Sequence, residues 1–173
     1  MVNKLYGTSF FEASEFSKAR KGGKSLIEFA TETFGPDDAR TKMLVEAVPW
    51  VEKAIAMRNA VEHPDGYSGR LVIENFRRDP DQKLSEPVWH RVKDGESATQ
   101  PSSIRADFDT FIHNLLTLAE DVLVSWATEN LESPEMMEIA IIPEEHRDPK
   151  NPAKYTVGPG PKLREALAKL PGG

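Results

Sequence analysis

Hydrophobic residues recur every three or four positions in two long stretches of the chain, a spacing typical of helices that bury one face. The first stretch covers residues 37–63, and its apolar positions are Leu44, Ala47, Val48, Val51, Ala54, Ile55 and Val61. The second runs from Ser102 or Ser103 to about Leu131, with an apolar stripe over about six helical turns. These two stretches predict the two long helices of the fold.

Proline and glycine set the expected ends of these helices. Pro49 interrupts the first stretch, so either the helix kinks there or a second helix begins with proline in its first turn. The helical pattern stops at His63-Pro64, because the residue before a proline avoids the helical conformation. Shorter helices are predicted at residues 25–34 and 163–170.

β-branched and aromatic residues gather between the two long helices, at residues 71–76 and 88–92. They predict a β-hairpin insertion covering about residues 69–93, with a long connection. Residues 138–142 are compatible with one further short strand, and proline, glycine and charge dominate afterwards. We therefore expect a mainly α protein, a helical bundle with a small hairpin insertion. Residues 1–150 would form this single domain and residues 151–173 a proline- and glycine-rich extension with a short helix.

Composition narrows the classes of function. The 173 residues include no cysteine, which excludes disulfides, thiolate metal sites and cysteine nucleophiles. Apolar runs are too short to span a membrane, and the first ten residues do not resemble a signal peptide, so we expect a cytoplasmic protein with no membrane partner. The net charge of -6 argues against a general nucleic-acid coat, which needs clustered lysine and arginine. A small local site for a few phosphates is still allowed.

The segment Arg58-Asn59-Ala60-Val61-Glu62-His63 is the strongest candidate for chemistry. Arg58 continues the apolar stripe of the first long helix, where a guanidinium needs a carboxylate, a phosphate or a partner chain. His63 follows five residues later, at the helix end before Pro64, where the break lets the imidazole turn back toward Arg58. Arg58, Asn59 and His63 are the predicted site residues.

This segment resembles the motif of the HEPN superfamily, an arginine and a polar residue followed by a histidine at the end of a core helix. Active members are helical bundles that act as metal-independent endoribonucleases, often as homodimers in which two motifs face each other. The resemblance therefore implies RNA as substrate, no cofactor and no metal. Many members are toxins or antiviral effectors, so an inhibitory protein partner is also compatible with it.

The residue types suit RNA cleavage by the 2′-hydroxyl group. Histidine titrates near neutral pH and can accept or donate the transferred protons. The planar guanidinium of Arg58 can bind two phosphate oxygens and stabilise the charge that develops there. Asn59 could orient the phosphate or His63.

Simpler interpretations compete with catalysis. Arg58 and Glu62 are four residues apart and could merely form a helix-surface ion pair. A histidine in the last helical turn is favoured by the helix dipole alone. The same residues could also bind RNA or nucleotides without cleaving them, or belong to a structural interaction protein. Residues 144–148 contain metal-binding residue types but lack the spacing of a metal site.

Overall fold

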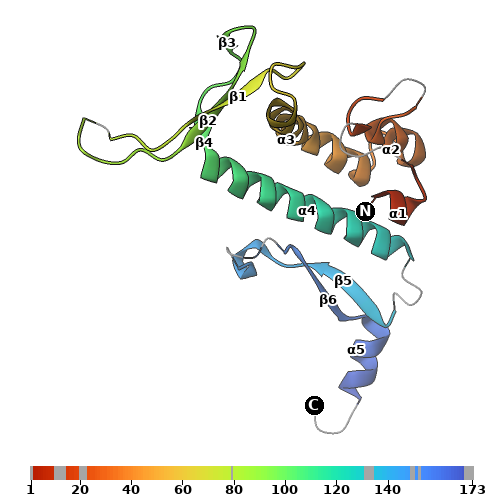
Figure 1. Ribbon diagram of the computed structural model, residues 1–173. Coiled ribbons are helices and arrows are strands. Elements are labelled where there is room, and N and C mark those ends of the chain that lie inside the picture. The colour runs from red at the N-terminus through yellow and green to blue at the C-terminus, as the bar shows by residue number, and fades with distance from the viewer. Residues whose placement is uncertain are drawn as a thin grey trace. The chain divides into compact units, whose positions relative to one another are not determined.

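The protein combines helices with two antiparallel sheets. The computed structural model describes residues 2–9, 15–19, 23–78, 80–130, 135–148, 151 and 153–169. The helices are α1 (Val2–Tyr6), α2 (Leu26–Phe34), α3 (Ala39–Glu62), α4 (Ile104–Asn130), the 3-10 helix η2 (Glu144–His146) and α5 (Pro161–Ala168). The strands are β1 (Arg70–Glu74), β2 (Val88–Lys93), β3 (Glu96–Ser97), β4 (Ser102–Ser103), β5 (Met137–Ile141) and β6 (Tyr155–Pro159) (Figure 1).

The prediction of a mainly α bundle with one small hairpin is wrong. Of the residues that the structure describes, about 51% are helical and 19% are in strands, which makes a mixed α/β fold with two sheets in that part of the chain. The second sheet pairs β5 with β6, from Met137 opposite Pro159 to Ile141 opposite Tyr155. The glycine and proline that end β6 masked it in the sequence, although proline is tolerated at the end of an edge strand. Because β5 and β6 are not adjacent in the chain, their pairing leaves no local pattern in the sequence.

Local signals explain the helices that precede the hairpin. Ser25 and Glu28 form a capping box at the start of α2, where each side chain accepts a hydrogen bond from the other residue's backbone N–H. Asp38 caps α3 by accepting from the backbone N–H of Arg40 at 2.9 Å. Of the two expectations for Pro49, a second helix that begins there is wrong, because α3 is one continuous helix through that residue.

The predicted hairpin is observed as β1 and β2, which pair antiparallel with Arg70 opposite Val92. The sheet is larger than expected, since β3 and β4 both pair with β2 on its other edge. Asp94 and Gly95, with φ of 54° and 83°, form the tight turn between β2 and β3. Strand β2 is therefore the centre of the sheet, and it carries Trp89, which is 8% exposed.

The chain divides into two compact units, residues 9–114 and residues 1–8 with 115–173. The core of the first unit comes mainly from α2, α3 and β2, and its buried hydrophobic residues are Phe16, Leu26, Ala30, Leu44, Ala47, Val51, Met57, Ala60 and Trp89. In the second unit, Asp121 binds Lys154 and Tyr155 beside β6, and Trp126 donates to the backbone of Leu5 in α1. The predicted domain boundary at residue 150 stays a prediction.

The short helix predicted at residues 163–170 is observed as α5, which ends at Ala168. Leu170 of the predicted helix lies outside the described residues. No helix in the described part of the chain has the length and apolar character needed to cross a membrane.

Candidate functional site

The predicted site residues lie at the C-terminal end of α3. Arg58 and Asn59 are in its last two turns, and His63 is the capping residue that follows Glu62. The backbone N–H of His63 donates to the carbonyl oxygen of Asn59 at 2.9 Å, and His63 itself leaves the helical conformation, with φ of -132° and ψ of 67°. The helix ends here because Pro64 disfavours the helical conformation in the residue before it. The sequence therefore places all three residues at one exposed helix terminus.

Glu62 joins this group through Arg58. Arg58 Nη2 lies 2.9 Å from Glu62 Oε2, and the two side chains are 53% and 44% exposed. The hydrogen bond from Arg58 lowers the pKa of Glu62 most, burial raises it by less, and electrostatic interactions with Arg58 and His63 lower it further. Glu62 is thus a charged carboxylate paired with the guanidinium of Arg58. The ion pair between Arg58 and Glu62 that the sequence suggested is present.

The helix geometry separates Arg58 from His63. Five residues at 3.6 residues per turn place His63 roughly 140° around the helix axis from Arg58. Asn59 lies between them and is half-buried, and its backbone carbonyl holds the N–H of His63. The imidazole of His63 would therefore have to rotate toward the guanidinium of Arg58, as the sequence predicts, after the last helical turn of α3. One chain therefore presents the two groups well apart around the axis of the same helix end.

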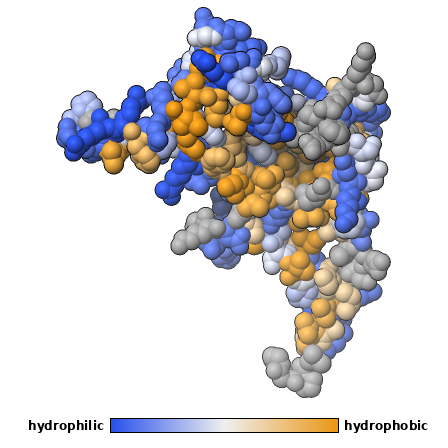
Figure 2. All heavy atoms as spheres, viewed as in Figure 1, coloured by the Kyte–Doolittle hydropathy of each residue, from blue (hydrophilic) through white to orange (hydrophobic). Residues whose placement is uncertain are grey.

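Arg58 and Glu62 also lie at the rim of an apolar groove with a volume of about 280 Å³. The groove is formed by α3, β2 and the first turns of α4, and its lining residues are Ala54, Met57, Arg58, Val61, Glu62, Trp89, Phe108 and Phe111. The rings of Trp89 and Phe108 pack 5.2 Å apart. Figure 2 shows hydrophobic surface in the region where the hairpin and the N-terminal half of α4 meet. Val61 and Phe108 remain 60% and 50% exposed.

A buried carboxylate, Asp107, accepts a hydrogen bond from Trp89, which lines this groove. Its side chain is 12% exposed and pairs with Lys53 Nζ at 2.6 Å. It also accepts hydrogen bonds from Trp89 Nε1 at 2.7 Å and Ser102 Oγ at 2.5 Å. Burial raises the pKa of Asp107, but the three hydrogen bonds, of which that from Lys53 is the strongest, outweigh this and lower it. Asp107 therefore connects α3, β2, β4 and α4 and fixes the position of Trp89.

Sequence reasoning did not identify Asp107. The available signal was an aspartate in the first helical turns of α4, which usually indicates only a favourable interaction with the helix dipole. Ser102 is close in the chain, but the other two partners, Trp89 and Lys53, are 18 and 54 residues away, so no local spacing reveals them.

A metal centre has no support from the described residues, where no group of three or more histidine, aspartate or glutamate side chains is placed to hold an ion. Glu144, Glu145 and His146 form the short 3-10 helix η2.

Comparison with protein-family models, with curated proteins and with solved structures finds no match to this chain. The function must therefore be argued from the residues of the site.

Proposed function

We propose that the protein is a metal-independent endoribonuclease that cleaves RNA through attack of the 2′-hydroxyl group, with Arg58, Asn59 and His63 as its site. The observation that carries the proposal is the placement of an arginine and a histidine at one accessible helix end, beside the charged Glu62. An exposed site suits a polymeric substrate, which must lie across the surface. The HEPN-like motif supports the same reaction.

The proposed chemistry assigns one role to each residue. The 2′-oxygen attacks phosphorus as a base takes its proton, the bond to the 5′-oxygen breaks, and an acid protonates that leaving oxygen. The products are a 2′,3′-cyclic phosphate and a free 5′-hydroxyl. The imidazole of His63 serves as base or acid, and the guanidinium of Arg58 neutralises the phosphate oxygens. Asn59 orients the phosphate or His63.

We infer that two copies of the chain complete the site. The reaction needs two proton transfers, whereas each chain offers one histidine at this helix end, and its Arg58 lies roughly 140° away from that histidine around the helix axis. The exposed apolar side chains of Val61 and Phe108 beside the motif suit burial in a homodimer. Arg58 and Glu62 have opposite charges, so a two-fold axis can pair each with the other on the second copy.

The alternative is a regulatory module that binds RNA or a protein partner without cleaving RNA. The groove favours this alternative, because its apolar floor and charged rim fit a partner's side chains. An inhibitory protein that covers Arg58 would use the same surface. We place either function in the cytoplasm. A sequence without cysteine is compatible with this location. So is the finding that no helix among the described residues is long and apolar enough to cross a membrane.

The test of the proposal compares the parent protein with Arg58→Ala and His63→Ala. We expect the parent to degrade mixed cellular RNA in the presence of a chelator, to leave 2′,3′-cyclic phosphate ends and to spare DNA, which lacks the 2′-hydroxyl. Each variant should lose cleavage by at least about a hundredfold, as removal of an acid–base group does, without a lower melting temperature. Equal cleavage by all three proteins would reject these residues as the site. Binding without cleavage by the parent would favour the regulatory module.

A further inference from the structure

A rigid turn follows the motif and presents Tyr67 to solvent. The turn is closed by backbone hydrogen bonds from Gly66 N–H to His63 O at 3.0 Å and from Gly69 N–H to Gly66 O at 2.8 Å. Tyr67 is 90% exposed, whereas its neighbour Ser68 is only 7% exposed. The backbone on both sides of Tyr67 is therefore well held, whereas its large aromatic ring is exposed to solvent.

The turn is held against strand β2. Gly69 adopts φ of +77°, and a Cβ atom there would lie 2.2 Å from the carbonyl oxygen of Val92. Arg91 Nη1 also donates to the carbonyl oxygen of Ser68 at 3.2 Å. This close backbone approach fixes the direction in which Tyr67 leaves the surface, so the ring is presented by packing and not by a loose loop.

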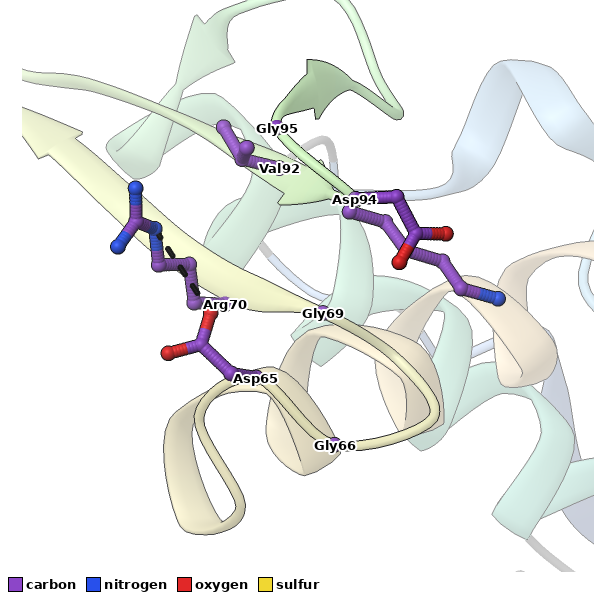
Figure 3. A pocket seen from close by; sticks show the side chains of 8 residues that line it. Asp65, Gly66, Gly69, Arg70, Val92, Asp94 and Gly95 are labelled. Atoms are coloured by element: carbon purple, nitrogen blue, oxygen red, sulfur yellow. Dashed lines mark ion pairs between the residues drawn. The ribbon is translucent and has the colours of Figure 1, made fainter.

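Positive charges accompany the exposed ring. Lys93 Nζ lies over the ring of Tyr67, 4.9 Å from its centroid. Arg70 follows the turn, with its side chain 56% exposed, and Asp65 approaches it only to 3.9 Å. A polar hollow of about 230 Å³ lies between this turn and the β2–β3 turn, with Arg70 and Lys93 in its wall. Figure 3 shows Arg70 and Asp65 on one side of this hollow and Asp94 on the other.

We propose that Tyr67 is a stacking platform for one base of single-stranded RNA, with Lys93 and Arg70 contacting the flanking phosphates. Aromatic stacking accepts any base, and lysine or arginine beside the ring neutralises the backbone that runs past it. The base stacks on the ring face opposite Lys93. Asp65 and Asp94 would repel phosphate from the hollow, which directs the strand along Tyr67. This inference rests on the proposed function in so far as RNA is the substrate, and it adds a positioning residue four positions after His63.

The binding test uses a fluorescein-labelled, mixed-sequence 2′-O-methyl oligoribonucleotide, which cannot be cleaved by 2′-hydroxyl attack. We expect Tyr67→Ala to weaken binding about tenfold, within the range of one base stack, and Tyr67→Phe to bind like the parent. Lys93→Ala should weaken binding and reduce the dependence of log Kd on log salt by about 0.7, the value for one phosphate on a single strand.

Two matched controls belong to this test. Phe76→Ala removes another exposed aromatic ring, 64% exposed, and Lys83→Ala removes another exposed lysine, so both should leave Kd unchanged. Thermal melting establishes that every variant is folded. Unchanged binding by Tyr67→Ala, or no binding by the parent, would overturn the platform. Binding that depends on Tyr67 in a parent that cleaves no natural RNA would uphold the platform and reject the ribonuclease.

Discussion

At the scale of single residues, Glu62 decides how Arg58 meets an anion. The carboxylate lies 2.9 Å from the guanidinium, and the hydrogen bond from Arg58 is the largest cause of its lowered pKa, which favours its charged form. A phosphate must therefore displace Glu62 before it binds Arg58 through both oxygens. An exposed pair of this kind contributes little to stability, because solvent screens it, so displacement is feasible.

Removal of this competing charge should strengthen RNA binding. We expect Glu62→Gln to lower the Kd for the 2′-O-methyl oligoribonucleotide about threefold at low salt, because the negative charge that competes with phosphate beside Arg58 is removed. Glu46→Gln, an exposed glutamate on the same helix, changes the net charge equally and is the control. Equal effects of both substitutions would show that only the overall charge matters, and weaker binding by Glu62→Gln would mean that Glu62 itself contacts RNA.

At the scale of secondary-structure elements, Asp107 is the contact that holds α3, β2, β4 and α4 together. Three donors converge on it, and Trp89, one of them, also lines the groove. The carboxylate stabilises the fold through its lowered pKa. Its contribution is therefore fully present above the ordinary aspartate pKa of about 3.9, and it is lost as the pH falls through the lowered value.

The corresponding substitution is Asp107→Ala, for which we expect a loss of about 3 kcal/mol in the free energy of unfolding at pH 7, because the donors of Trp89 and Ser102 lose a buried acceptor. Urea unfolding at pH 7 and at pH 3 measures this loss. The difference between parent and variant should shrink at pH 3, because the unfolded chain then binds a proton at Asp107, which the folded protein with its lowered pKa binds less readily. Asp109→Ala, an exposed carboxylate on the same helix, is the control and should cost less than about 0.5 kcal/mol. A difference that is independent of pH would contradict the assigned role of the charge.

At the scale of the whole molecule, the exposed apolar residues near the motif bear on assembly. Val61 on α3 and Ile112 on α4 are 60% and 54% exposed, within the unit that carries the site. If two copies bury them, Val61→Glu and Ile112→Glu should convert a homodimer to a monomer in sedimentation velocity and should reduce RNA cleavage. Val45→Glu, which also places a charge on an exposed valine of α3, should remain dimeric. A monomeric parent at micromolar concentration would reject the two-copy site.

Periodicity and helix-end signals predicted α2, α3, α4 and α5 from the sequence alone, but not α1 or the 3-10 helix η2. The stripes of α3 and α4 and the stop at His63-Pro64 are local, because each depends on residues within one or two turns. They also placed Arg58, Asn59 and His63 together at a helix end. The strand pattern before and after the long connection predicted the pairing of β1 with β2 for the same reason.

Only the tertiary structure decided the second sheet, the partners of Asp107 and the exposure of Tyr67. Strand β6 ends in glycine and proline and is recognisable only through its register with β5. Asp107 looked like an ordinary helix-start residue until Lys53, Trp89 and Ser102 converged on it. In the sequence, Tyr67 looks like an ordinary loop residue. In the structure, the close approach of Gly69 to Val92 fixes the turn that exposes Tyr67 to solvent. Each of these features depends on contacts between parts of the chain that are distant in sequence. Such contacts produce no periodic pattern of residues, so the sequence alone does not reveal them.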